Sequence, residues 1–271
     1  MLLFNNDFLP RQDLQLPISN RAFQYNDGFF ETIMVVDGKL RFWNDHKARI
    51  REAAAALYLA IPDYFWGEEL EENLLQLARQ RNAANFGRLK LKVWRAGEGL
   101  YTPHTNDIEW LATAAPTQPI PYTSIKVGIS QMARTCLSPL SHFKGPHAPL
   151  YVLAGIEKQN RNLDDILLLN AQGHVAELIS SNIFWLKDGV LYTPTVDTGC
   201  VNGILRRNIL RWCQNKGIAV QEVLAAPDEL LQADMVFSTN VTGIRSMKEI
   251  DTHTLPSCND WLQNMRAELQ V

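Results

Sequence analysis

The stretch from Gly199 to Gly217 reads GCVNGILRRNILRWCQNKG. Its pattern predicts a glycine-rich turn that leads directly into a helix over residues 204–216, with Gly217 as a left-handed cap behind it. The first amides of such a helix have no partner inside the helix and lie at the positive end of its dipole. The stretch therefore predicts either an anion site, typically for a phosphate, or simply a loop that enters a helix.

Strand and helix patterns flank this stretch on both sides. Short apolar runs between turn residues indicate strands, and apolar residues at helical spacing indicate helices. In the second half of the chain we expect strands over 124–130, 166–170, 219–223 and 235–238, a helix over 150–160, and paired strands within 175–192 that turn at Asp188-Gly189.

The first third of the chain shows a similar mixture. Asp37-Gly38, between two apolar runs, is typical of a hairpin turn. We expect strands over 2–4, 32–36, 40–43, 88–95 and 109–114, and helices from residue 45 to the proline at 62 and over 68–81. These elements form a strand-helix-helix-strand module.

Three prolines within residues 116–123 mark a connection between two parts of the chain. Proline lacks an amide donor and favours extended backbone, so this segment suits a linker better than a strand. We therefore expect a small N-terminal α/β domain over 1–115, the linker over 116–123, and a larger C-terminal domain over 124–271.

The composition excludes several classes of protein. Of 271 residues, 46% are hydrophobic and 20% are charged, and 26 Lys and Arg stand against 29 Asp and Glu without long blocks of either sign. This is typical of a globular protein and gives no sign of a nucleic-acid or membrane partner. The N-terminal segment is too polar for a signal peptide, and the longest apolar run, over 53–61, is too short for a membrane span. We expect a cytoplasmic protein.

Motifs for metals and nucleotides are absent from the sequence. Four cysteines lie far apart, at positions 136, 200, 213 and 258, and among six histidines only His142 and His147, on either side of Lys144, form a local cluster. We expect surface loop histidines and no metal. Arg49 lies early in a predicted helix, where a cation is unfavourable, so it is either a ligand-binding residue or a solvated one.

Several short segments, taken in chain order, resemble the class IV aminotransferase family. The resemblance covers about residues 3 to 250, and it rests on NDGFFET at 26–32, HKARI at 46–50, Lys144, DILLLN at 165–170, Glu177, SSNIF at 180–184, YTP at 192–194 and NGILR at 202–206. It implies a two-domain α/β (α+β) fold like that of D-amino-acid aminotransferases, and pyridoxal 5'-phosphate (PLP) as the cofactor of a fold-type IV enzyme.

The resemblance also implies roles for particular residues. Lys144 matches the catalytic lysine that forms a Schiff base with the cofactor; burial beside a cation would lower the pKa of its amine and allow it to react. Glu177 matches the carboxylate that keeps the pyridine nitrogen protonated, so that the ring can accept electrons. Asn182 is expected near the ring.

The phosphate of the cofactor is expected to be bound by Arg49 and by the amides of Ile204 and Leu205, where helix geometry already predicts an anion. A later turn within 238–243 supplies the remaining contacts, with Thr239 and Asn240 as the matching residues. Phe30 is expected to contact the substrate. Arg95 is expected either to contact a carboxylate of the substrate or to be a surface arginine of its strand. By the same resemblance the protein is a homodimer that acts on a small molecule.

Three functions are compatible with these residues. The segments 182–187 and 202–206 resemble 4-amino-4-deoxychorismate lyases most, and the arginines that bind substrate carboxylates in D-amino-acid and branched-chain aminotransferases have no match in 97–101 or 90–92. We therefore expect elimination of pyruvate to give 4-aminobenzoate, a folate precursor. The alternatives are transamination of a branched-chain or D-amino acid with a 2-oxo acid, and a non-catalytic relative that keeps the fold.

Overall fold

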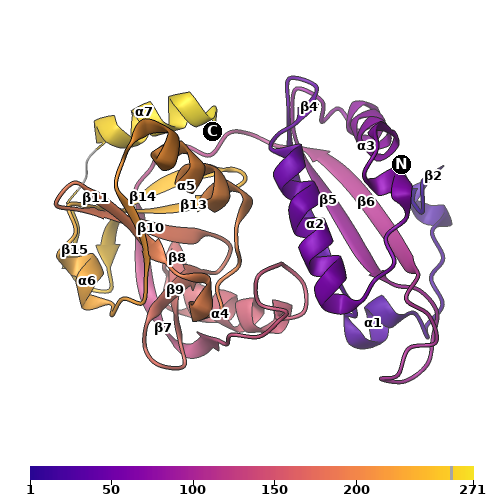
Figure 1. Ribbon diagram of the computed structural model, residues 1–271, viewed down its shortest axis with the longest axis horizontal. Helices are drawn as coiled ribbons and strands as arrows, with labels where there is room; N and C mark the ends of the chain where they lie inside the picture. The colour runs from indigo at the N-terminus through magenta and orange to yellow at the C-terminus, as the bar shows by residue number, and fades with distance from the viewer. Residues whose placement is uncertain (257–258) are drawn as a thin grey trace. The chain divides into compact units, whose positions relative to one another are not determined.

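The computed structural model describes residues 1–256 and 259–271 (Figure 1). It confirms the mixed α/β class, because it holds one six-stranded and one nine-stranded sheet together with several helices. The chain divides into two compact units. Unit 1 comprises Met1–Pro119 and Phe143–Pro146, and unit 2 comprises Ile120–His142 and His147–Val271.

The short segment Phe143–Pro146 differs from the expected organisation, which places it in the C-terminal domain. Two hydrogen bonds account for this difference: the Phe30 amide and the Asn26 side chain, both in unit 1, donate to carbonyl oxygens of this segment. The change of unit between residues 119 and 120 lies inside the proline-rich segment, and the domain boundaries at 1–115, 116–123 and 124–271 stay a prediction.

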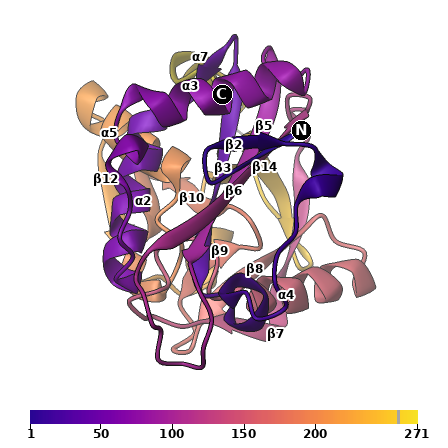
Figure 2. The ribbon, with the colours of Figure 1, turned by 90° about the vertical axis from the view of Figure 1, so that its right-hand side faces the viewer.

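Unit 1 is an antiparallel sheet with strand order β2-β1-β6-β5-β3-β4 (Figure 2). Two longer helices pack against it, and shorter helices lie in its connections. Its elements are β1 (Leu2–Phe4), β2 (Asp7–Leu9), the 3-10 helix η1 (Arg11–Asp13), α1 (Arg21–Tyr25), β3 (Gly28–Val36), β4 (Lys39–Leu40), α2 (Trp43–Leu57), the 3-10 helix η2 (Asp63–Phe65), α3 (Glu68–Gln80), β5 (Phe86–Arg95) and β6 (Ile108–Pro116).

The hairpin between β3 and β4 is confirmed at Asp37-Gly38. Both residues have positive φ, 48° and 74°, as a tight hairpin turn requires. The predicted strand over 40–43 is wrong: β4 ends at Leu40 and α2 begins at Trp43. Phe42 adopts a left-handed conformation as the N-cap residue, which ends the extended segment and starts the helix.

Side chains of the central strands alternate between two faces of the sheet. Glu31 of β3, Leu91 of β5 and Ala112 of β6 are aligned in one row, and all three are buried. The next row, Thr32, Lys90 and Thr113, points to the opposite face and is more exposed. This alternation separates a buried polar cluster under α2 from an open polar face.

Unit 2 contains the larger sheet, with order β12-β11-β10-β13-β14-β7-β8-β9 and β15 beside β14. Helices α4, α5 and α7 pack around it. Its elements are β7 (Ile125–Thr135), α4 (Ala148–Asn160), β8 (Asp165–Asn170), β9 (Val175–Leu178), β10 (Asn182–Lys187), β11 (Val190–Pro194), the 3-10 helix η3 (Val196–Thr198), α5 (Ile204–Lys216), β12 (Val220–Val223), α6 (Asp228–Leu231), β13 (Met235–Asn240), β14 (Gly243–Ile250), β15 (His253–Thr254) and α7 (Asn259–Leu269).

Helix α5 confirms the prediction drawn from the 199–217 stretch. It covers Ile204–Lys216, and Gly217 behind it has φ 67° and donates its amide to the Cys213 carbonyl. The hairpin at Asp188-Gly189 is confirmed as well. Cys136, Cys200 and Cys213 are free thiols, and Cys258 lies outside the described residues. Within residues 1–256 and 259–271, every helix is too short or too polar to cross a membrane.

Candidate active site

The candidate residues fall into two sets, one in each unit. In unit 1, the backbone around Lys144 is fixed against the first residues of β3. The Phe30 amide donates to the Lys144 carbonyl oxygen at 2.9 Å. The Asn26 side-chain amide donates to the Gly145 carbonyl oxygen at 2.7 Å. Lys144 thus keeps a defined place in unit 1, although it lies more than 100 residues from β3 in the sequence.

A close approach of two backbones makes this arrangement possible. Gly145 has φ +145°, and a Cβ atom there would lie 2.7 Å from the Gly28 carbonyl oxygen and 2.8 Å from the Phe29 Cα atom. Only glycine fits such a conformation without strain. Beside it, the rings of Phe29 and Phe143 pack edge to face with centroids 6.1 Å apart. The glycine after Lys144 therefore has a structural reason.

Arg49 belongs to a buried charged cluster between α2 and β3. Its Nε donates to Glu31 Oε1 at 2.8 Å and its Nη2 donates to Glu31 Oε2 at 2.6 Å. On the preceding turn of α2, His46 Nδ1 lies 2.6 Å from Glu31 Oε2. All three side chains are almost fully buried. The bidentate pair fixes the guanidinium plane of Arg49, so Glu31 is the residue that orients it.

The protonation states of this cluster follow from burial and from the opposite charges. Burial alone would raise the pKa of Glu31, but the Arg49 charge, with the charge and hydrogen bonds of His46 and Arg49, outweighs it and holds the pKa at about 2. Burial lowers the pKa of His46, and Glu31 opposes that effect only in part. At neutral pH the cluster is therefore an ionised carboxylate between an arginine cation and a neutral imidazole.

The two residues expected to contact substrate have different surroundings in unit 1. Phe30 is partly exposed, and Lys90 Nζ lies 4.6 Å from its ring centroid. Arg95 is buried: it donates to Asp27 at 3.0 Å, to Asn106 at 2.5 Å and to the Leu57 carbonyl at 2.6 Å. These bonds give Arg95 a role in holding the connection between β5 and β6. Its contact with a substrate stays a prediction.

In unit 2, Glu177 is buried at the centre of a hydrogen-bond network. Its Oε1 accepts from the Tyr151 hydroxyl at 2.7 Å, and its Oε2 accepts from the Val201 amide at 3.1 Å. The Val201 carbonyl in turn accepts from the Asn182 side chain at 2.7 Å. Burial raises the pKa of the Cys200 thiol to about 12, and the nearby Glu177 charge adds to the shift. The network holds Glu177 in one orientation.

The start of α5 has the features of an anion site. Gly203 is its N-cap residue and provides no side-chain cap, so the amides of Ile204 and Leu205 lack partners within the helix. A Cβ atom at Gly203 would lie 2.0 Å from Asn182 Oδ1, which shows how closely the turn approaches β10. In the next strand, Thr239 is aligned with Asn182.

A buried hydroxyl beside this turn supports the same interpretation. Thr239 is 1% exposed, and its Oγ1 has no hydrogen-bond partner among the described residues. Such a group is costly to leave unpaired, so it indicates a polar ligand. Asn240 donates to Ser181 Oγ at 3.0 Å and accepts from the Thr242 amide at 2.9 Å. The donors around α5 fit a phosphate group.

Several functional residues were not found by sequence reasoning. Asn26 and Glu31 lie inside the quoted NDGFFET motif, but only the structure shows that they position Lys144 and Arg49. Tyr151, the partner of Glu177, lies in a segment whose pattern indicates only a helix. His46 contradicts the expectation of surface histidines, because it is fully buried. The described part of the chain brings together no group of three or more potential metal ligands.

Comparison with known proteins identifies the family. The sequence model of the amino-transferase class IV family matches residues 28–250. The chain therefore belongs to the class IV aminotransferase family and is an enzyme of fold type IV. An aminodeoxychorismate lyase of Vibrio harveyi is 28% identical over 232 residues, 83% of each chain. A D-alanine aminotransferase of Bacillus licheniformis is 30% identical over 266 residues, 94% of this chain and 90% of that one.

A solved structure confirms the fold. The branched-chain aminotransferase of the archaeon Thermoproteus uzoniensis, determined with norvaline, matches with a TM-score of 0.90 at 20% identity, over 99% of this chain and 93% of that one. Relatives with three different activities are thus similar to this chain. Family membership implies PLP, and the comparisons leave the reaction to be proposed from the residues.

Proposed function

We propose that the protein binds PLP and uses Lys144 as its catalytic residue. When bound, the cofactor supplies an aldehyde that reacts with amines and a ring that accepts electrons. Two hydrogen bonds support this role: the Phe30 amide donates to the Lys144 carbonyl and the Asn26 side chain donates to the Gly145 carbonyl, so the backbone that carries this lysine has a defined place. Glu177, fixed by Tyr151 and Val201, would hold a proton on the pyridine nitrogen.

We propose two groups of donors for the cofactor phosphate. The first is Arg49, oriented by Glu31. The second lies at the start of α5, where Ile204 and Leu205 offer amides, and at the end of β13, where Thr239 offers a buried hydroxyl and Asn240 lies next to it. The unpaired hydroxyl of Thr239 is the observation that carries the proposal most directly, because a buried hydroxyl needs a polar partner and the described residues provide none.

For the reaction, we propose elimination of pyruvate from 4-amino-4-deoxychorismate. The Lys144 amine would take up the proton from the ring carbon that bears the amino group. Loss of pyruvate then makes the ring aromatic, and the product is 4-aminobenzoate. The lyase-like segments 182–187 and 202–206 and the Vibrio harveyi relative support this choice.

Transamination is the second candidate, and the 30% identical D-alanine aminotransferase favours it. The same lysine and carboxylate would serve both reactions, because both begin with removal of a proton from the carbon next to the amino group. The two reactions differ in their later steps. In transamination the amino group passes to a 2-oxo acid, whereas elimination breaks the carbon–oxygen bond between the ring and the pyruvate group.

One experiment separates these functions. Purified holoenzyme is supplied with 4-amino-4-deoxychorismate while pyruvate is measured, and separately with D-alanine or branched-chain amino acids plus 2-oxoglutarate while glutamate is measured. We expect pyruvate without glutamate. Glutamate without pyruvate would replace the lyase by a transaminase. Lys144→Ala should abolish either activity, whereas Lys248→Ala, which removes an exposed lysine, should not.

We also propose that the protein forms a homodimer, as the family resemblance implies. Three partly exposed apolar side chains on α4, Val152, Leu153 and Ile156, support an interaction with another protein surface, because apolar patches of this kind favour burial.

A further inference from the structure

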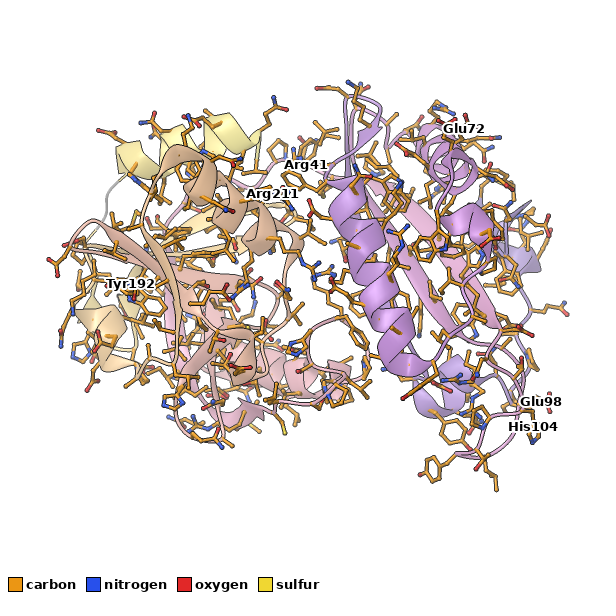
Figure 3. The ribbon with its side chains drawn as sticks, in the orientation of Figure 1. Arg41, Glu72, Glu98, His104, Tyr192 and Arg211 are labelled. Atoms are coloured by element: carbon orange, nitrogen blue, oxygen red, sulfur yellow. The ribbon has the colours of Figure 1, made fainter. Side chains whose placement is uncertain are left out.

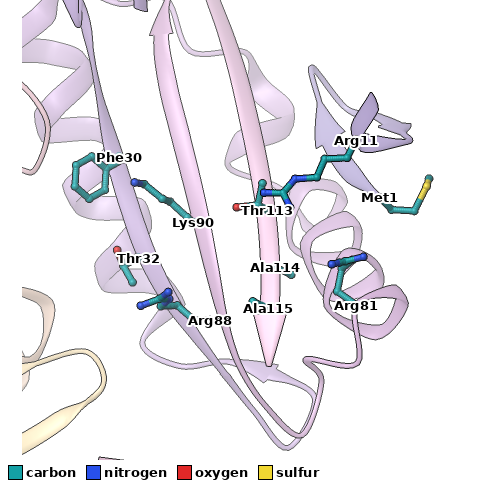
Figure 4. Close-up of a pocket in the computed structure, with 10 residues that line it drawn as sticks. All are labelled: Met1, Arg11, Phe30, Thr32, Arg81, Arg88, Lys90, Thr113, Ala114 and Ala115. Atoms are coloured by element: carbon teal, nitrogen blue, oxygen red, sulfur yellow. The ribbon is translucent and has the colours of Figure 1, made fainter. Parts of the chain in front are cut away.

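A pocket of about 340 Å³ opens on unit 1 (Figure 4). Glu31, His46 and Arg49 are not among its lining residues. Its size lies within the range of small-molecule sites. The floor is the open face of the central strands, with Thr32 of β3 and Thr113 of β6 on either side of Lys90. The rim comes from segments far apart in the sequence, including Arg11 of η1 and Arg81 behind α3.

The pocket extends around one edge of the sheet. Strand β1 pairs with β6 only at Leu111 and Ala112. Beyond that point residues 113–115 of β6 have no neighbouring strand on this side among the described residues, and all three line the pocket. The residue that follows α3, Arg81, therefore lines the same pocket as Arg88 of β5.

Four cationic side chains line this pocket: Arg11, Arg81, Arg88 and Lys90. No Asp or Glu is among its lining residues. All four are exposed, and none makes a side-chain hydrogen bond or an ion pair with any residue of 1–256 or 259–271. Three buried arginines of unit 1 are paired instead: Arg21 and Arg95 with Asp27, and Arg49 with Glu31.

An uncompensated group of like charges is unfavourable for the folded chain. Arg88, Lys90 and Lys92 follow one another on the same face of β5, since side chains alternate along a strand. The repulsion between these charges affects Lys92: burial lowers the pKa of its amine, and the charge of Lys90 lowers it further. The chain as a whole has a net charge of −3, so the positive charge is a local feature of this pocket.

We propose that this pocket binds a small multivalent anion carrying phosphate or carboxylate groups. The guanidinium group of arginine can donate two parallel hydrogen bonds to a phosphate or to a carboxylate. Three arginines and one lysine can also neutralise several negative charges on the same ligand. The confined volume favours a small molecule over a macromolecular surface. None of the four cations is among the residues proposed to bind the cofactor. Phe30, which is expected to contact the substrate, also lines the pocket beside Lys90, so the inference adjoins the proposed substrate site and rests in part on the proposed function.

The test uses sodium tripolyphosphate as the probe and the holoenzyme as the protein, so that the cofactor occupies its own phosphate site. Calorimetric titration should show one site per chain, with affinity that falls as salt rises. The paired variant Arg81→Gln/Arg88→Gln should bind at least about tenfold more weakly, because it removes two charged hydrogen-bond donors to the anion. Parallel titrations with citrate and with orthophosphate separate carboxylate from phosphate ligands.

A matched control removes the same charge elsewhere. Lys39→Gln/Lys248→Gln changes two exposed lysines outside the pocket and should leave the affinity within about twofold of wild type, because screened distant charges contribute little. Equal weakening by both pairs would show a general charge effect and overturn the proposal, as would absence of tripolyphosphate and citrate binding to wild type. If the paired variant does not fold, Arg11→Gln alone takes its place. Binding should persist in Lys144→Ala, which separates this site from the proposed reaction.

Discussion

Glu31 is the residue on which the geometry of Arg49 depends. A fully buried carboxylate, placed between a guanidinium and an imidazole, is stable only because both partners contact it directly. If the guanidinium takes the phosphate of the cofactor as we propose, Glu31 acts as a positioning residue one layer behind that contact. His46 completes the cluster by contacting the same carboxylate oxygen as Arg49 Nη2.

This cluster predicts a particular pH dependence of stability. The pKa of Glu31 is about 2 in the folded protein against an ordinary value of 4.5. Its contribution is therefore fully present above about pH 4.5 and is lost as the pH falls toward 2. Glu31→Gln should lower the free energy of unfolding by about 3 kcal/mol at pH 7, and this difference should shrink at pH 3. Urea unfolding at the two pH values measures it.

Glu72→Gln is the control for Glu31→Gln, because Glu72 is a residue of α3 whose side chain is exposed (Figure 3). It should change the free energy of unfolding by less than about 0.5 kcal/mol at either pH. A Glu31→Gln protein as stable as wild type at pH 7 would show that the buried pair does not stabilise unit 1.

Tyr151 is predicted to tune the chemistry of Glu177. Its hydroxyl donates to the carboxylate, so Tyr151→Phe removes a bond that favours the charged form of Glu177. Turnover should fall about tenfold, as expected for a hydrogen bond to a charged group, and the pH profile of the visible absorbance band should shift. Tyr192→Phe is the control, because the Tyr192 hydroxyl makes no hydrogen bond to a described residue. Identical spectra for Tyr151→Phe and wild type would count against the role.

Among the segments of the chain, Phe143–Pro146 matters most for the proposed function, because it contains Lys144. Its place depends on a backbone contact that a side chain at position 145 would prevent. Gly145→Ala should therefore displace Lys144, reduce the amount of cofactor that borohydride can fix to the protein, and lower activity by at least about tenfold, since a displacement near 1 Å at a catalytic group costs about that much or more.

Gly155→Ala is the control for Gly145→Ala, because it makes the same substitution at a glycine within a helix. Gly155 lies within α4, and a Cβ atom there meets nothing within 4 Å. It should leave cofactor binding unchanged and raise the free energy of unfolding by about 0.5–1 kcal/mol, because alanine has the better helix propensity. Unchanged cofactor fixation in Gly145→Ala would contradict the account of the Lys144 segment.

The elements show where sequence reasoning succeeds and where it fails. Helix α5 is predicted with its bounds, because Gly203 and Gly217 delimit an amphipathic pattern. The strand predicted over residues 40–43 is wrong, because two apolar residues around Arg41 look extended although the chain turns at Phe42. Strand β14 is not predicted, since its mixed sequence obtains its structure from pairing with β13 and β7. Local patterns predict local structure, and long-range pairing overrides them.

At the scale of the whole molecule, the division into two units is expected from the sequence, but not the return of Phe143–Pro146 to the first. No periodicity could indicate it, because it rests on contacts between residues more than 100 positions apart. The same holds for the candidate site. The resemblance to the family is enough to identify Lys144, Arg49 and Glu177. The residues that orient Arg49 and Glu177 are found only in the structure; they are Glu31, His46 and Tyr151.

The proposed homodimer makes a prediction about the assembly. Light scattering should give twice the mass of one chain. Val152→Glu/Ile156→Glu should reduce it to one, because the charges would oppose burial of the α4 face. Leu224→Glu, at an exposed leucine outside α4, is the control and should leave the assembly intact. A wild-type mass of one chain would contradict the dimer, and an unchanged mass in the α4 variant would place the interface elsewhere.

The central claim is that the amine of Lys144 holds the cofactor. Holoenzyme is reduced with borohydride and digested, and the peptides are analysed by mass spectrometry. We predict a pyridoxyl phosphate adduct on Lys144 and on no other lysine. Attachment to a different lysine, or no adduct in protein saturated with PLP, would contradict the account.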